Sequence, residues 1–357
     1  MRQSESLLRT LVARGGSDLH LVAGSPPRMR LDGELVQLDT QPLSAAELDA
    51  VVAEILPAAA REVFEREDGA DFAHAIEGLA RFRVSLVRQL NGLAVVFRAI
   101  PDRTLTLEEL EMPPVIGHLA MQRNGLILVA GKTGSGKSTT LAAMIDAINR
   151  SRRGHILTIE DPIEFLHERR RCLISQRQVG LHTPGFAEAL HSALREDPDV
   201  ILVGEMRDLE TISLAVTAAE TGILVLGTLH TNGAAAAMDR IINAFPAIQQ
   251  SQIRSMLSTS LRGVISQQLA RRADGRGRVA AVEVLVNTPA VSHLIREGRT
   301  DQLLGTMQAG ALVGMQTRDT ALRRLLDAGV ITGAEAHRQA LDKAEFEAVR
   351  RRGAPAP

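Results

Sequence analysis

The second half of the chain alternates between short apolar runs and stretches in which apolar residues recur at helical spacing. Runs of strand length occupy 126–130, 155–160, 199–203 and 223–230. Helical spacing covers the intervals between them, at about 137–150, 185–195 and 208–220. Strands that alternate with helices in this way predict a mostly parallel sheet of the α/β class. From Ala234 onward the pattern predicts mainly helix, with one further strand at 279–285.

The first hundred residues predict a small α+β module instead. Apolar and polar positions alternate at 72–76, 80–87 and 93–98, and the last run follows a turn at Asn91-Gly92. This arrangement is typical of a β-meander. Upstream, Ser44-Ala-Ala-Glu47 has the capping-box pattern of a helix start, and the helix is expected to run through Ile55.

These patterns divide the chain into four parts. We expect an N-terminal α+β domain at 1–100 and a polar, proline-bearing linker at 101–114. An α/β domain with a mainly helical C-terminal part is expected at 115–345, and a disordered tail at 346–357.

A phosphate-binding loop follows the first apolar strand of the α/β domain. Residues 131–138 read Gly-Lys-Thr-Gly-Ser-Gly-Lys-Ser and fit the pattern G-x-x-x-x-G-K-[ST]. The glycines allow successive N–H groups to converge on phosphate oxygens, and the helix that follows adds the positive end of its dipole. Lys137 is expected to contact the β- and γ-phosphates, and Ser138 to ligate Mg²⁺. A Gly-rich surface turn would explain neither the strand nor the helix, so we predict ATP binding by Gly131, Lys132, Thr133, Gly134, Ser135, Gly136, Lys137, Ser138 and Thr139.

The carboxyl ends of parallel strands decide which acidic residues can reach the phosphates, because ligands bind at that edge. Glu205 follows the strand at 199–203 and lies at this edge, where it can hold Mg²⁺ directly or through water. Asp199 opens the same strand at the opposite edge, so we expect it to have a structural role.

Three more carboxylates, of Glu160, Asp161 and Glu164, leave the neighbouring strand at the same edge. Three carboxylates beside a triphosphate are electrostatically unfavourable. Their presence therefore favours a role in holding a cation or in activating an attacking water. A carboxylate can orient water in line with the γ-phosphate and accept its proton. Glu164 is our first candidate for this role and Glu160 the second. The alternative for each acid is a capping residue in a solvated turn.

His230 ends the strand at 223–230. Its ring can hydrogen-bond either the γ-phosphate or the Glu205 carboxylate, and so report hydrolysis to the helices behind it. A single histidine at a strand end is more often structural, but the three other elements expected at this edge favour a functional role.

Composition mainly excludes other classes of protein. The 357-residue chain has a net charge of -1, no Trp, no Tyr and 8 Phe. A nucleic-acid-driven motor of the RecA type is disfavoured, because such proteins need a basic surface and stacking aromatic rings. The lone Cys172 excludes an intrachain disulfide and a four-cysteine zinc site. No signal sequence and no apolar run of transmembrane length is visible, so a cytoplasmic protein without a transmembrane segment is expected.

Several long motifs now identify the chain as similar to the type IV pilus retraction ATPases, the PilT-type members of the secretion ATPase superfamily. The resemblance covers nearly the whole chain. Besides the phosphate-binding loop, it rests on Thr158-Ile-Glu-Asp-Pro-Ile-Glu-Phe165, on residues 194–211 with Val-Gly-Glu-Met-Arg, on Thr217-Ala-Ala-Glu-Thr-Gly222, on Gly227-Thr-Leu-His-Thr231 and on Gly314-Met-Gln-Thr317.

The resemblance implies a PAS-like N-terminal domain, a RecA-like P-loop ATPase domain and a homo-hexameric ring with nucleotide between subunits. It implies ATP hydrolysis with Mg²⁺, bound by Ser138 and Glu205, to power pilus retraction through an inner-membrane platform protein at which the motor is peripheral. Glu205 is implied as the Walker B acid and Glu164 as the catalytic base. Arginines of the N-terminal domain are implied to complete the site, and Arg81, Arg83 and Arg98 occupy the corresponding meander. For each arginine the alternative is a solvated strand face.

Three positions depart from the family pattern. Ile223 stands where a first histidine usually follows Glu-Thr-Gly, so a relay through two histidines is reduced to His230. The segment 180–185 lacks its usual acidic residue. The retraction signature reads Ala290-Val-Ser-His-Leu-Ile-Arg-Glu297, with Ser292 and His293 in place of the usual polar pair. With these changes two further roles stay open for this chain: an accessory retraction paralogue, or a retraction motor that shares its work with such a paralogue. An assembly ATPase of pili or type II secretion is disfavoured by the compact first domain and the single cysteine.

Overall fold

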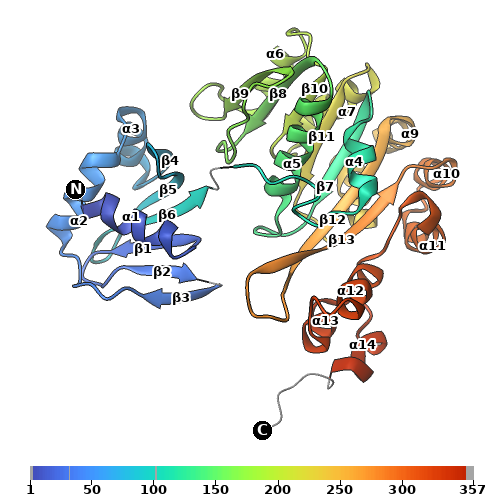
Figure 1. The fold of residues 1–357 in the computed structure, drawn as a ribbon. Helices are drawn as coiled ribbons and strands as arrows, with labels where there is room; N and C mark the ends of the chain where they lie inside the picture. The colour runs from blue at the N-terminus through green and yellow to red at the C-terminus, as the bar shows by residue number, and fades with distance from the viewer. Residues whose placement is uncertain (1–2, 32, 101–102, 351–357) are drawn as a thin grey trace. The chain divides into compact units, whose positions relative to one another are not determined.

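The computed structural model describes residues 3–31, 33–100 and 103–350, and it divides by its internal contacts into two units, Met1–Arg103 and Thr104–Pro357 (Figure 1). Each unit is described by itself. The division falls within the segment predicted as a linker, of which residues 101 and 102 lie outside the described residues. Leu107, further along that segment, is buried in the core of the second unit. The second unit therefore begins before the predicted linker ends.

The described part of the first unit is built on an antiparallel sheet with the strand order β3-β2-β1-β6-β5-β4. Alternate strand residues such as Leu19, Phe82 and Phe97 are buried together with apolar residues of the helices. The predicted α+β class is confirmed, and Ser44 and Glu47 form the predicted capping box. The elements are α1 (Gln3–Ala13), β1 (Asp18–Val22), β2 (Arg28–Leu31), β3 (Glu34–Gln37), α2 (Ala45–Ile55), α3 (Ala58–Glu67), β4 (Gly69–Ile76), β5 (Ala80–Gln89) and β6 (Gly92–Ile100).

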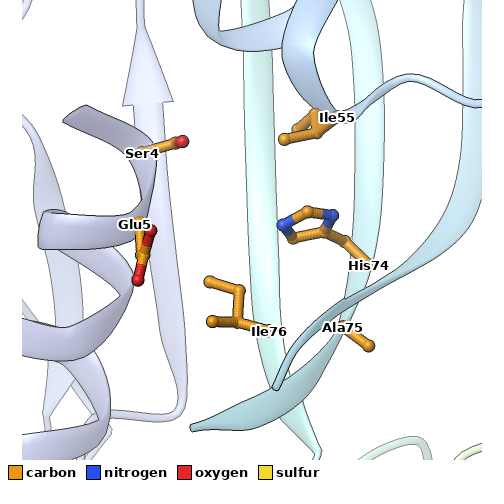
Figure 2. Close-up of a pocket in the computed structure, with 6 residues that line it drawn as sticks. All are labelled: Ser4, Glu5, Ile55, His74, Ala75 and Ile76. Atoms are coloured by element: carbon orange, nitrogen blue, oxygen red, sulfur yellow. The ribbon is translucent and has the colours of Figure 1, made fainter. Parts of the chain in front are cut away.

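A small pocket of about 200 Å³ lies in this unit between α1, the end of α2 and β4 (Figure 2). Ser4, Glu5, Ile55, His74, Ala75 and Ile76 line it. None of these six residues belongs to the predicted nucleotide site.

The second unit contains the predicted parallel sheet, with the order β13-β12-β7-β11-β10-β8-β9 among the described residues. All neighbouring pairs are parallel except the hairpin of β12 and β13. Its strands are β7 (Gly125–Ala130), β8 (Gly154–Glu160), β9 (Cys172–Gln178), β10 (Val200–Val203), β11 (Leu224–Leu229), β12 (Leu261–Arg271) and β13 (Arg278–Val286).

Helices cover both faces of this sheet. Along β7, Leu126 and Leu128 pack into a core with helices α6 to α11, whereas Ile127 and Val129 pack into a core with α4 and α5. Burial on both faces explains why β7 has no alternating pattern. The helices are α4 (Pro114–Ala120), α5 (Lys137–Ser151), α6 (Phe186–Ala193), α7 (Leu209–Glu220), α8 (Ala234–Ala244), α9 (Gln250–Ser260), α10 (Pro289–Glu297), α11 (Leu303–Ala309), α12 (Arg318–Asp327), α13 (Gly333–Gln339) and α14 (Lys343–Arg350), with short 3₁₀ turns η1 (Ala247–Gln249), η2 (Thr300–Gln302) and η3 (Ala311–Val313).

The sequence pattern missed strand β12 and predicted helix there. Its apolar residues 261, 264, 265 and 269 have the spacing of a helical face. The strand is enclosed between β7 and β13, with residues buried on both faces, so the period of two that would reveal a strand is lost.

The C-terminal helices pack on the β12–β13 hairpin next to the turn that joins its two strands. Ala270 and Val279 share a small core with Leu322 of α12 and Phe346 of α14. Because Phe346 is fully buried in helix α14, the predicted disordered tail is wrong for residues 346–350, and residues 351–357 lie outside the described part. None of the helices in the described part combines the length and apolar character needed to cross a bilayer.

Candidate nucleotide site

The loop between β7 and α5 has the backbone geometry of a phosphate cradle. Gly131, Gly134 and Gly136 have φ angles of 149°, 76° and 89°, a region that side chains disfavour. A Cβ atom at Gly136 would lie 2.8 Å from Nε2 of Gln267. The backbone conformation therefore requires glycine at position 136, and the Gln267 side chain fills the space beside it.

Lys137 begins helix α5 and turns its side chain back over the loop. Its Nζ donates to the carbonyl oxygens of Gly131, at 2.9 Å, and Lys132, at 3.1 Å. Burial lowers the pKa of Lys137, while the charges of Glu205 and Glu164 act in the opposite direction. The two acids predicted from separate strands thus both act on the ammonium of the loop.

Ser138 and Thr139 lie half-buried in the first turn of the 15-residue helix α5. The Ser138 hydroxyl and the Glu205 carboxylate are oxygen donors, which Mg²⁺ prefers. Mg²⁺ is usually held by only one or two protein ligands together with substrate phosphates, so this donor set fits the ion.

Glu205 follows the carboxyl end of β10 and has two partners. Its Oε2 lies 2.6 Å from Nη2 of Arg207, and its Oε1 lies 3.3 Å from Nε2 of His230. Burial works to raise the pKa of Glu205, but the hydrogen bonds and charges of Arg207 and His230 outweigh it, and the pKa lies below its usual value. The carboxylate is thereby kept ionised at the edge where a cation would bind.

Glu160 and Glu164 occupy different environments although they belong to one loop. Oε1 of Glu160 accepts hydrogen bonds from Thr158 Oγ1 (2.7 Å) and Gln176 Nε2 (3.3 Å), and Oε2 accepts the backbone N–H of Glu164 (3.4 Å). Burial raises the pKa of Glu160. Glu160 is therefore engaged in holding the loop, which favours Glu164 as the group that orients water.

Asp199 lies at the opposite edge, as predicted from its place at the start of the strand. Its Oδ2 accepts the backbone N–H of His155 at 2.7 Å, and this bond joins the amino ends of β8 and β10. The contact is structural.

Arg81, Arg83 and Arg98 belong to the first unit, so their role at the nucleotide stays a prediction. Arg83 and Arg98 are directly opposed in the β5–β6 ladder, which puts them on one face of the sheet. Arg98 donates to Asp18 at 2.8 Å, and Arg83 lies 3.7 Å from Asp71. Nε of Arg81 is buried and has no hydrogen-bond partner among the described residues.

Sequence reasoning missed three residues of β12 and β13 that contact the site loops. Gln267 donates to the Ser135 carbonyl of the phosphate loop at 2.7 Å. Ser266 and Glu283 accept the N–H groups of Gly233 (3.0 Å) and Ala234 (2.7 Å), just after His230. For Ser266 and Gln267 the available signal was the polar run Ser266-Gln267-Gln268 inside the mainly apolar segment 263–270.

Known proteins resemble this chain in sequence and in fold. The family model described as type II/IV secretion system protein matches residues 1–338. The chain belongs to this family. It is 51% identical to the type IV pilus retraction ATPase PilT of Pseudomonas aeruginosa, and the match covers 94% of this chain and 97% of that protein. It is 44% identical to the type IV pilus ATPase PilU of the same organism, and this match covers 93% of this chain and 87% of PilU.

A solved structure of another family member confirms the fold. The crystal structure of the pilus retraction motor PilT with bound ADP has a TM-score of 0.87 and 42% sequence identity, and the alignment covers 96% of this chain and 98% of that chain. The predicted fold class, an α/β P-loop ATPase fold behind an α+β domain, is thereby confirmed.

The first departure from the family pattern lies far from the phosphate loop. Ile223 precedes β11, and its carbonyl accepts the N–H of Gly125 at the start of β7. Strand β11 separates it from His230, and six residues at ~3.3 Å each span about 20 Å. A histidine at position 223 would therefore not meet His230 or the phosphates in the same subunit.

The altered retraction signature forms helix α10, and its two substituted residues differ in environment. Ser292 Oγ donates to the carbonyl of Ser258 at 2.7 Å, which ties α10 to α9. His293 is exposed. Ser292 is thus engaged in packing between helices, whereas His293 is available for contacts outside the chain.

Proposed function

We propose that this chain is an ATP-hydrolysing motor that powers type IV pilus retraction. The proposal is supported by the charges of Glu205 and Glu164 that act on the Lys137 ammonium, by the contact of Glu205 with His230, and by a match to a retraction ATPase along nearly the whole chain. The motor acts as a homo-hexamer in the cytoplasm and is peripheral at the inner membrane through a pilus platform protein.

We propose the following division of roles among the residues of the site. Lys137 binds the β- and γ-phosphates, and the N–H groups of the loop bind the remaining oxygens. Ser138 and Glu205 hold Mg²⁺, which neutralises charge on the phosphates when bound. Glu164 orients the attacking water and accepts its proton. His230 follows the state of the Glu205 carboxylate through the contact at 3.3 Å.

Arg81, Arg83 and Arg98 complete the site from a neighbouring subunit in this proposal. An arginine that reaches the γ-phosphate stabilises charge that develops in the transition state. Hydrolysis would then require the ring, and an isolated subunit would bind ATP without turning it over at an appreciable rate.

Deletion of the gene that encodes the chain, followed by imaging of surface fibres, tests the biological role. Retraction predicts many static fibres, and restoring the wild-type gene but not the Lys137→Ala variant returns them to a retracting state. Absence of fibres would contradict the proposal and point to an assembly motor. Fibres that still retract, with reduced force, would instead assign the accessory role that the similarity to PilU suggests.

A further inference from the structure

Gln267 lies on β12, about 130 residues after the phosphate loop, and both ends of its side-chain amide contact that region. Nε2 donates to the carbonyl oxygen of Ser135 at 2.7 Å, and Oε1 accepts from Oγ1 of Thr140 at 2.9 Å. The side chain is 1% exposed. A buried polar side chain with both ends hydrogen-bonded holds its partners in a fixed arrangement.

The first of these bonds fixes the direction of a loop N–H group. The peptide bond between Ser135 and Gly136 is trans, so its C=O and N–H point in opposite directions. Because the carbonyl is held toward Gln267, the Gly136 N–H points away from β12. The N–H groups of such loops are the donors that bind phosphate oxygens.

The second bond fixes the start of helix α5. Thr140 lies one turn after Gly136, and its backbone N–H donates to the Gly136 carbonyl at 3.0 Å. Gln267 therefore contacts both ends of the segment that contains Lys137 and Ser138. A tilt of this segment away from β12 would stretch or break one of the two side-chain bonds.

The strand and the loop are also in close steric contact. A Cβ atom at Gly131 would lie 2.6 Å from the Gln267 carbonyl, and one at Gly136 would lie 2.8 Å from its Nε2. Gly131 is thus needed for the close approach of the β12 backbone, and Gly136 leaves room for the Gln267 amide.

We propose that Gln267 is a positioning residue for ATP: it orients the Gly136 amide and the first turn of α5 so that Lys137 and Ser138 meet the phosphates. The inference rests on the proposed function, since it assumes that the loop binds ATP. Gln267 acts through the loop and does not itself touch the nucleotide.

Gln316 provides a matched control. It is also a buried glutamine, 6% exposed, with two side-chain bonds: Nε2 donates to the Val282 carbonyl at 2.7 Å, and Oε1 accepts from Arg324 Nη1 at 2.6 Å. None of its partners belongs to the phosphate loop or α5. Replacing either glutamine by methionine keeps similar volume and removes two hydrogen bonds.

The experiment measures, for the full chain and each variant, the Kd of a fluorescent ATP analogue with Mg²⁺, kcat, and Tm with and without nucleotide. Gln267→Met and Gln316→Met should both lower Tm without nucleotide by several degrees. Gln267→Met should also weaken nucleotide binding about tenfold and reduce the rise in Tm on adding nucleotide. Gln316→Met should leave Kd and kcat within about twofold.

Thr140→Val and Thr140→Ser test the same contact should Gln267→Met fail to fold. Valine removes only the bond to Oε1 and should weaken binding severalfold, and serine, which keeps the hydroxyl, should restore it. Unchanged Kd and kcat in Gln267→Met, with a Tm loss equal to that of Gln316→Met, would overturn the positioning role. If the wild-type chain binds no nucleotide, the proposed function fails and this inference with it.

Discussion

Nε2 of His230 lies 3.3 Å from Oε1 of Glu205, and this contact joins the ends of two neighbouring parallel strands, β11 and β10. The other carboxylate oxygen of Glu205 is bound by Arg207 at 2.6 Å. A change at the phosphate that alters the Glu205 carboxylate would therefore be transmitted to His230, which is separated by residues 231–233 from the start of helix α8 at Ala234.

Replacing His230 by glutamine should affect turnover more than binding. Glutamine can still donate a hydrogen bond to Glu205, but the charge of His230, which helps to lower the pKa of Glu205, would be lost, and Lys137 and the loop would be unchanged. We expect kcat to fall about 10- to 100-fold and the Kd of ATP to change less than threefold. His191 is the control, because its ring lies 3.7 Å from Glu210 at an exposed site outside the loop region. Equal effects of His191→Gln and His230→Gln on kcat would contradict a specific role for His230.

Lys137→Ala should abolish tight ATP binding. The ammonium is buried and directed at the loop, and its loss removes a charge-assisted bond to phosphate. We expect the Kd to rise about 100-fold or more, which corresponds to about 3 kcal/mol. Lys343 is a matched control, since its ammonium also donates to two backbone carbonyls, of His337 and Arg338. Tight binding by the Lys137 variant, measured by titration calorimetry, would refute the predicted contact.

Stability should fall as the pH is lowered from 6.5 toward 4, partly because of His167. Burial lowers the pKa of this residue from 6.5 to about 4, although the charge of Asp146 acts in the opposite direction. The lowered pKa contributes stability that is fully present above pH 6.5. Between pH 6.5 and about pH 4 the unfolded chain takes up a proton at His167 that the folded chain does not. This contribution to the free energy of unfolding, on the order of 3 kcal/mol, is therefore lost as the pH falls from 6.5 to about 4.

Urea unfolding at a series of pH values measures this effect. His167→Gln should make the dependence of the unfolding free energy on pH shallower between pH 4 and 6.5. The exposed His293, replaced by glutamine, is the control. If the two variants show the same slope, His167 does not titrate as its burial indicates.

Ile223→His should leave ATP hydrolysis within about twofold of the wild-type rate. The residue lies at the amino end of β11, about 20 Å from His230, and packs against the sheet core. The polar ring should cost about 1 kcal/mol of stability at this half-buried site. A several-fold change in steady-state hydrolysis would show that the second histidine of the family pattern acts by a route outside the single subunit.

The parallel sheet and the side chains at its carboxyl edge could be predicted from sequence because both depend on local patterns. The loop at 131–138 has a fixed spacing, and the strand ends place Glu205 and His230 on one edge by topology alone. The same rule put Asp199 at the far edge, where it bonds His155.

Contacts that join distant parts of the chain could not be predicted in this way. Gln267 contacts Ser135, which lies 132 residues earlier in the chain, and the periodicity of apolar residues in β12 does not indicate this contact. Strand β12 itself was interpreted as helix because it is buried on both faces. At the C-terminus, burial of Phe346 beneath the Arg323 guanidinium, 4.5 Å from the ring centroid, orders a helix that composition suggested was disordered.

The central claim is that a carboxylate at this edge, that of Glu164, activates water against bound ATP. Its most direct test compares ATP binding and single-turnover phosphate release in assembled wild-type, Glu164→Gln and Glu160→Gln proteins with Mg²⁺. We expect Glu164→Gln to bind ATP like the wild type and to release phosphate 10²- to 10⁴-fold more slowly, with a smaller loss for Glu160→Gln. Phosphate release near the wild-type rate in Glu164→Gln, or none from the wild type itself, would contradict the claim.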